Sequence, residues 1–296
     1  MPRRRRFLLC LTVVIVIMHA TFVSAEETLA LHLRSRAKVE GKDEYAVKEE
    51  AAVWPAKKTA LFICDMWDDH WCKGAALRVA EMAGPMNEMV RAARDKGVLI
   101  VHCPSSVTGF YKDTPQRRLA QQAPFAPPPA ALALPEHWGT AWCAIDRKRE
   151  AALPIDDSDN GCDCDEKCTI RQPWSRQIAT IEIGNADAIT DNGQEVWNLL
   201  SQRGIDNVII CGVHLNMCVL GRPFGIRQMT KLGKHVALIR DMTDTMYNHE
   251  RPPGVNHFRG TELMVEHVEK YWCPSFASTD LTEKPAFQFK EAAESR

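Results

Sequence analysis

The segment Val208-Ile-Ile-Cys-Gly-Val-His-Leu-Asn-Met-Cys218 decides the fold prediction, because an apolar run passes through a short loop to a cysteine. A second apolar run, Thr59-Ala-Leu-Phe-Ile-Cys-Asp65, stops at a carboxylate. Short apolar runs of this kind are typical of buried strands in a parallel sheet. Chemistry in open parallel sheets collects at the carboxyl ends of the strands. The two segments therefore predict an aspartate and a cysteine at one edge of a sheet.

Helical and strand patterns alternate around these two segments. Pro85 is expected to open an amphipathic helix, and the strand 98–102 then completes a βαβ unit. Further along, the pattern predicts a strand at 178–183, helices at 193–203, 218–232 and 261–271, and strands at 208–211 and 235–240. This alternation predicts an α/β fold with a three-layer, doubly wound, mainly parallel sheet.

The chain divides into segments of different character. We expect a signal peptide at 1–25, an arm or hairpin at 26–55, the α/β domain at 56–273 and a tail at 274–296. A long irregular insertion interrupts the domain at about 104–176. Apolar residues make up 45% of the chain and charged residues 25%, which is ordinary globular composition. The net charge of −1 provides no general attraction to nucleic acid, so a nucleic-acid partner is not expected.

The N-terminus has the pattern of a secretory signal. Arg3 to Arg6 form a basic region, 7–17 is almost wholly apolar, and Val23-Ser24-Ala25 resembles a cleavage site. A membrane anchor is less favoured, because a span needs about 20 apolar residues. We therefore expect export to the periplasm or the extracellular space, with the Sec and twin-arginine routes both left open.

Cys218 and Asp65 form a candidate catalytic pair. A cysteine at the start of a helix has its thiolate stabilised by the backbone amides, which lowers its pKa. Asp65 could accept the thiol proton and pass it to a leaving amine. The alternative is that Cys218 is a small buried apolar residue and that Asp65 only caps a strand.

Two motifs resemble those of a known superfamily. Asp65-Met-Trp-Asp-Asp-His70 and Gly212-Val-His-Leu-Asn-Met-Cys-Val219 are similar to the segments of isochorismatase-like cysteine hydrolases, which include nicotinamidases and N-carbamoylsarcosine amidases. The resemblance covers about residues 56–245 without the insertion. It implies a cis peptide between Val213 and His214, and an oxyanion held by the N–H groups of His214 and Cys218. It also implies hydrolysis of a small amide-like substrate through a Cys218 thioester, no cofactor, and frequent self-association.

The chain departs from the superfamily at the third catalytic residue, a lysine. The corresponding place falls near Asn185, where the sequence has no lysine. Arg222, four residues after Cys218, and Arg176 are the candidate replacement cations, although either could be an ordinary surface ion pair. The missing lysine keeps a second function open: a catalytically degenerate small-molecule binding or interaction protein. Relatives that cleave a vinyl ether leave the reaction type open as well.

Polar and aromatic residues near the strand ends are expected to line the pocket: Trp67, Asp69, His70, His102 and Asn216. Nicotinamidases carry a metal site on an Asp-x-His sequence, but this chain has His102-Cys-Pro-Ser-Ser106 there. We predict no metal at that place. Zinc bound by His70, His102 and His214 stays open.

The insertion contains the acidic, cysteine-bearing run Asp156-Asp-Ser-Asp-Asn-Gly-Cys-Asp-Cys-Asp-Glu-Lys-Cys168. Asp156, Ser158 and Asn160 fit a calcium loop, but Lys167 stands where an EF-hand needs a glutamate. The spacing Cys-x-Cys-x3-Cys is not a standard zinc spacing, so disulfides are favoured, with zinc or calcium left open. Such a segment could cover the strand-end cleft and select the substrate.

Overall fold

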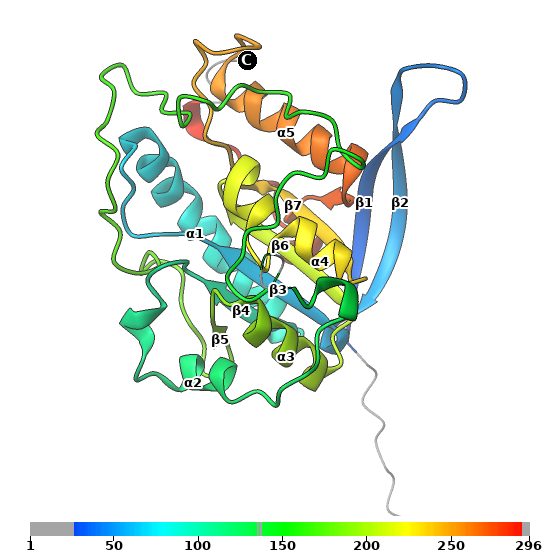
Figure 1. Cartoon of the computed structure of the whole chain (residues 1–296), viewed down its shortest axis with the longest axis vertical. Helices are drawn as coiled ribbons and strands as arrows, with labels where there is room; N and C mark the ends of the chain where they lie inside the picture. Colours follow the sequence, from blue (N-terminus) through cyan, green and yellow to red (C-terminus); the bar gives the residue numbers. More distant parts are fainter. Residues whose placement is uncertain (1–26, 135, 137, 292–296) are drawn as a thin grey trace, which may run out of the picture.

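The computed structural model describes residues 27–134, 136 and 138–291, and one eight-stranded sheet organises them (Figure 1). The strand order is β2-β1-β8-β7-β6-β3-β4-β5. The pairs of β1 with β2 and β8 are antiparallel, and all other pairs are parallel. The strands are β1 Thr28–Lys38, β2 Tyr45–Pro55, β3 Thr59–Cys64, β4 Leu99–Cys103, β5 Ala188–Ile189, β6 Asn207–Val213, β7 His235–Asp244 and β8 Ser275–Phe276.

Helices cover both faces of the sheet, which confirms the predicted three-layer α/β fold. They are α1 Lys73–Asp95, α2 Pro115–Gln121, α3 Gly193–Arg203, α4 Ile226–Lys231, α5 His257–Tyr271 and α6 Thr279–Thr282. Within the part of the chain that the structure describes, no helix combines the length and apolar character needed to cross a bilayer.

The central strand β3 shows why two cores form. Its side chains alternate between faces, as in any strand. Leu61 and Ile63 pack in one core with the apolar side of α1, whereas Phe62 packs in the other with residues of α3, α4 and α5. Every residue of β3 is buried, so the strand reads as a continuous apolar run.

Two helix predictions need correction. Pro85 does not open α1 but lies inside it, because the alanine-rich turns from Lys73 onward already favour a helix. The expected helix at 218–232 is interrupted: a π-helical turn spans Leu215–Val219, and α4 begins only at Ile226. Pro223 lies between them and cannot donate the backbone hydrogen bond that a continuous helix would need.

The strand predicted at 178–183 is wrong. Residues 178–183 form turns and irregular chain, and the short β5 occupies the edge next to β4 instead. The Thr190 N–H donates to the His102 carbonyl at 3.0 Å, which extends this edge pairing. The irregular chain after β4 therefore runs to about residue 187 and contains α2.

The predicted arm and tail both contribute to the sheet. The arm is a long hairpin of β1 and β2 that projects beyond the body of the molecule, with Arg34 of β1 paired to Ser275 of β8 (Figure 1). The segment expected to be a tail supplies β8 and α6. The predicted signal peptide lies outside the described residues.

Candidate active site

Asp65 lies directly after the central strand β3, where β4 and β6 end on either side. Its backbone has a left-handed φ of 47°, and its side chain is fully buried. Carboxylate Oδ1 accepts a hydrogen bond of 2.7 Å from the backbone N–H of Ser105, just beyond β4. Oδ2 has no hydrogen-bond partner of good geometry. A buried carboxylate oxygen without a hydrogen bond is uncommon and calls for a structural explanation.

Cys218 lies in the π-helical turn that follows β6, with 7% of its surface exposed. The peptide bond between Val213 and His214 at the end of β6 is cis. Gly212 just before it has φ of 103°, and a Cβ atom there would lie 2.0 Å from the Cys64 carbonyl oxygen. Only glycine fits this close approach of β6 to β3.

Arg222 completes the group. Its Nε lies 3.4 Å from Asp65 Oδ2, which pairs a guanidinium with the buried carboxylate. The guanidinium also stacks over the ring of Trp142, with its central carbon 4.7 Å from the ring centroid. The structure therefore brings Arg222, Asp65 and Cys218 together.

Burial and charge set the protonation of this group. Burial raises the pKa of Asp65 above its ordinary value, and Arg222 is the largest opposing influence. Burial and the Asp65 charge raise the pKa of the Cys218 thiol, and Arg222 opposes them. The expectation of a lowered cysteine pKa is thus wrong, because dehydration and a nearby carboxylate outweigh the helix amides. Cys218 is therefore favoured as a neutral thiol beside the Asp65 carboxyl group.

An aromatic wall stands beside this group. The rings of Trp67 and Trp174 stack with their centroids 4.4 Å apart, and His70 stacks on Trp174 at 5.6 Å. His70 meets the His214 ring edge-on at 5.0 Å. Burial lowers the pKa of His70 to about 4 and the pKa of His214 to about 3, so both rings are neutral at neutral pH.

Other predicted pocket residues have different partners. His102 contacts Gln177 at 2.9 Å and Asp187 at 3.0 Å. Asp69 pairs with Lys73, while the Asn216 amide binds Asp157 and the Met246 backbone. Arg176, the second candidate cation, pairs with Asp68 at 3.8 Å rather than with Asp65.

The residues considered as calcium ligands and the three histidines considered as zinc ligands have other contacts in the structure. In the calcium-like run, Asp156 and Ser158 both accept hydrogen bonds from Arg251. Among the described residues, the metal-binding geometry is found at Cys72, Cys162 and Cys164, and not at His70, His102 and His214. None of the ten cysteines described forms a disulfide, so the disulfide staple of the insertion stays a prediction.

Three residues at the site were missed by the sequence prediction: Ser105, Trp142 and Trp174. Ser105 had a usable signal, because it follows the strand next to β3 and its amide therefore reaches the same sheet edge. The two tryptophans lie in the irregular insertion, where no periodicity predicts a neighbour.

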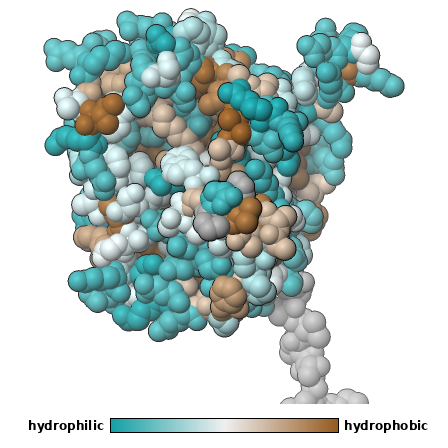
Figure 2. Space-filling view, viewed as in Figure 1, coloured by the Kyte–Doolittle hydropathy of each residue, from teal (hydrophilic) through white to brown (hydrophobic). Residues whose placement is uncertain are grey.

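The insertion packs against the segment that contains Cys218 and Arg222. The Cys143 N–H donates to the Gly221 carbonyl at 2.7 Å, one residue before Arg222. A Cβ atom on Gly221 would lie 2.7 Å from the Trp142 ring, so the two segments are in close contact. In Figure 1 the green insertion crosses in front of the sheet and continues along α5. On this face apolar residues are scattered among hydrophilic ones (Figure 2). The insertion therefore packs directly against the residue that precedes Arg222.

Comparison with known proteins gives structural likenesses of low identity. No protein-family model and no curated protein matches the chain. A cysteine hydrolase from Pseudomonas syringae pv. phaseolicola is 15% identical with a TM-score of 0.47, over 78% of this chain and 94% of that one.

Two further solved structures are isochorismatase family proteins. The one from Burkholderia thailandensis is 12% identical with a TM-score of 0.41, over 77% of this chain and 95% of that one. The one from Desulfovibrio vulgaris is 16% identical with a TM-score of 0.37, over 71% and 89%. At these TM-scores the functional argument depends on the site residues themselves.

Proposed function

We propose that the protein is a cysteine hydrolase of the isochorismatase-like type that acts on a small, amide-like substrate. The observation that carries the proposal is the contact of Arg222 with Asp65 beside the buried Cys218 thiol. A base, a nucleophile and a cation of this kind are the groups that acyl transfer requires.

The proposed reaction uses Asp65 as a proton carrier. As the Cys218 sulfur attacks the carbonyl carbon, the thiol proton passes to Asp65, and the oxyanion forms near the N–H groups of His214 and Cys218. Asp65 then protonates the leaving amine, which leaves a thioester on Cys218. Water attacks the thioester as Asp65 accepts its proton. The carbon–sulfur bond then breaks, Asp65 returns the proton to the Cys218 sulfur, and the carboxylic acid leaves. Arg222 stabilises the negative charge shared by Asp65 and the sulfur throughout.

Alkylation of Cys218 by iodoacetamide tests this assignment. The rate is measured against pH, with the modified cysteine identified by peptide mass spectrometry, in the wild type and in Asp65→Asn. We expect modification of Cys218 near neutral pH that falls at least about tenfold in Asp65→Asn, because the proton acceptor of the thiol is lost and this outweighs the lower thiol pKa that removal of the Asp65 charge favours. An inert Cys218 thiol in both proteins contradicts the nucleophile assignment.

A second candidate function is a binding or interaction protein without turnover. The 7% exposure and raised pKa of Cys218 favour it, because a covered, protonated thiol is unreactive. The two functions differ in one result. A panel of small amides and a vinyl ether would give acid or alcohol products with the hydrolase, and thermal stabilisation without products with the binding protein.

Export is a further part of the proposal, supported by the basic and apolar pattern of the N-terminus. Intact mass and N-terminal sequencing of the protein from an extracytoplasmic fraction test it. A mature chain that starts near residue 26 is expected, whereas an uncut chain in the cytoplasmic fraction contradicts export.

A further inference from the structure

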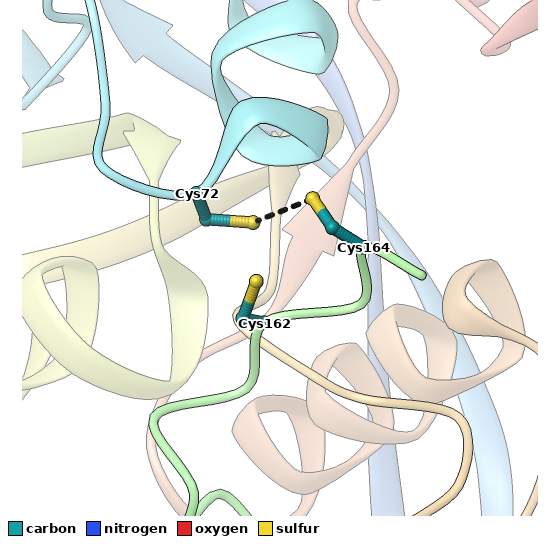
Figure 3. Close-up of side chains that lie close together, drawn as sticks. All are labelled: Cys72, Cys162 and Cys164. Atoms are coloured by element: carbon teal, nitrogen blue, oxygen red, sulfur yellow. Dashed lines mark hydrogen bonds between the residues drawn. The ribbon is translucent and has the colours of Figure 1, made fainter. Parts of the chain in front are cut away.

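Three cysteine side chains from two distant segments point toward one another (Figure 3). Cys72 is the residue before α1, and Cys162 and Cys164 lie in the insertion. Their sulfur atoms all lie within 4.8 Å of one another, and the Sγ atoms of Cys72 and Cys164 are 3.8 Å apart. This cluster is separate from Cys218 and has no role in the proposed reaction.

The sulfur separation fits a bound metal ion better than a disulfide. A disulfide joins its sulfurs at about 2.05 Å. In a tetrahedral zinc site with zinc–sulfur bonds of about 2.3 Å, neighbouring sulfurs lie about 3.8 Å apart. The distance between Cys72 and Cys164 equals that tetrahedral edge.

A fourth cysteine, Cys168, lies next to these three, although its sulfur is not within 4.8 Å of all of theirs. Cys168 packs against the same cluster, and its thiol interacts with those of Cys162 and Cys164. It is more exposed than Cys72 and Cys162, as expected of a ligand on the outer side of a site. One residue from the domain and three from the insertion would then surround one point.

Backbone N–H groups point at the sulfur atoms. The Gly74 N–H donates to Cys164 Sγ at 3.3 Å. The backbone N–H groups of Cys164 and Cys168 approach the Cys162 sulfur. Hydrogen bonds of this kind stabilise thiolates and are a common outer shell of metal–thiolate sites.

A site of four thiolates and one divalent cation carries two negative charges in total. The charges around the cluster are suited to such a site. Lys73 follows Cys72, and Lys167 donates to the Cys162 carbonyl at 3.0 Å. The one carboxylate inside the cluster, Asp163, is neutralised by Arg78 at 2.7 Å and by His257 at 3.1 Å.

We propose that Cys72, Cys162, Cys164 and Cys168 bind one structural Zn²⁺ ion that fastens the insertion to the start of α1. Binding releases the thiol protons and involves no redox step. The site does not depend on the proposed hydrolase activity. It lies beside the aromatic wall, because the Cys72 N–H donates to His70 Nδ1 at 3.1 Å. The ion therefore also fixes the position of His70 next to His214.

Metal analysis of the full chain tests the proposal directly. The wild type is purified without chelator, and bound metals are measured by mass spectrometry after acid digestion. We expect about one zinc per chain, lost in Cys164→Ser and Cys168→Ser. Cys273→Ser is the matched control: Cys273 is a buried cysteine in the main core, outside the cluster, and its variant should keep the zinc.

Cobalt titration of the wild type covers the case in which the serine variants fail to fold. Metal-free protein should gain the sulfur-to-cobalt charge-transfer band and the visible bands of tetrahedral Co²⁺ at one equivalent, and Zn²⁺ should abolish them. Removal of zinc should lower the melting temperature, because the ion binds only the folded chain. The proposal is overturned by purified wild type with stoichiometric iron, by protein that neither holds zinc nor binds cobalt, or by a Cys72–Cys164 disulfide in non-reducing peptide maps.

Discussion

In the proposed mechanism, Arg222 is the cation that stabilises the negative charge shared by Asp65 and the Cys218 sulfur. A guanidinium is planar, stays protonated and stacks on aromatic rings, and here it lies between Asp65 and the Trp142 ring. The cation enters from the helix side after Cys218 rather than from the segment near Asn185. The charge is thereby supplied from a different element of the fold.

Replacing Arg222 tests this role. Arg222→Met should lower the rate of Cys218 alkylation near neutral pH at least about tenfold, because a nearby cation shifts such pKa values by about one to three units. Arg222→Lys should restore part of the rate. Arg176→Gln is the matched control, since Arg176 pairs with Asp68, and its rate should equal that of the wild type. Equal losses in Arg222→Met and Arg176→Gln would contradict the role given to Arg222.

Gly212 is the residue where the backbone itself limits substitution. Gly212→Ala should reduce the free energy of unfolding by about 3 kcal/mol or more, because it adds strain at φ of 103° and a clash with Cys64. Gly84→Ala is the control: it lies in α1 with open space around it and should be neutral or stabilising by up to about 1 kcal/mol. Urea denaturation measures both changes, and equal effects would show that the close approach does not matter.

At the scale of elements, regular patterns made the sheet predictable. The bounds of β3 and α3 agree with the predicted 59–64 and 193–203, because a fully apolar run and an amphipathic repeat with an asparagine cap are strong local signals. The run at 178–183 has similar residues, but the position next to β4 in the sheet is occupied by β5. The strand prediction at 178–183 failed because pairing in the sheet depends on tertiary contacts, which a local sequence pattern does not contain.

The residues of the candidate active site could be predicted from the sequence where they follow a regular strand or helix pattern. Asp65 and Cys218 follow long apolar runs, and Arg222 follows Cys218 at helical spacing. Trp142 and the cluster of cysteines depend on how the insertion folds back on the domain. The spacing of Cys162, Cys164 and Cys168 in the sequence showed that these three cysteines lie close together. Cys72 could not be added to them, because it is 90 residues from Cys162 in the sequence although it is adjacent in space.

Glu150 anchors the insertion to α4 and α5. It pairs with Arg227 at 2.8 Å and accepts hydrogen bonds from His267 and Trp272, both at 2.9 Å. Although burial acts to raise its pKa, these partners lower the pKa to about 2. The group therefore stabilises the protein above pH about 4.5, and this contribution is lost as the pH falls toward 2.

Glu150→Gln should cost about 3 kcal/mol of unfolding free energy, because it leaves the buried Arg227 charge without its partner. Glu182→Gln removes an exposed carboxylate paired with Arg91 and should leave the free energy of unfolding nearly unchanged, because solvent screens this pair. Denaturant titration at neutral pH compares the two variants. Similar small losses in both would show that Glu150 does not anchor the insertion.

At the scale of the whole molecule, a second buried network joins α1, β7, α5 and the insertion. Arg78 Nε lies 2.7 Å from Asp244, and His257 Nε2 lies 2.8 Å from the same carboxylate. Burial acts to lower the pKa of His257, but Asp244 and Asp163 raise it to about 9. His257 is therefore charged in the folded protein at neutral pH.

The pH dependence of stability follows from this network. A raised pKa in the folded state gives stability that is complete below the unfolded value near 6.5 and is lost as the pH rises through about 9. We expect the free energy of unfolding to fall by about 3 kcal/mol across this range. His257→Gln should flatten the dependence. A wild-type profile that is level from pH 6.5 to 9.5 would contradict the charged state of His257.

The pairing of Asp65 with Arg222 has a consequence for how ligands arrive. One negative and one positive charge cancel, the adjacent imidazoles of His70 and His214 are neutral, and Cys218 is a thiol. The group of Asp65, Arg222 and Cys218 therefore has little net charge, and we expect it to attract neither anions nor cations from a distance. Reaction of Cys218 with an uncharged reagent should be nearly independent of ionic strength. An anionic reagent of the same size should gain no advantage at low salt.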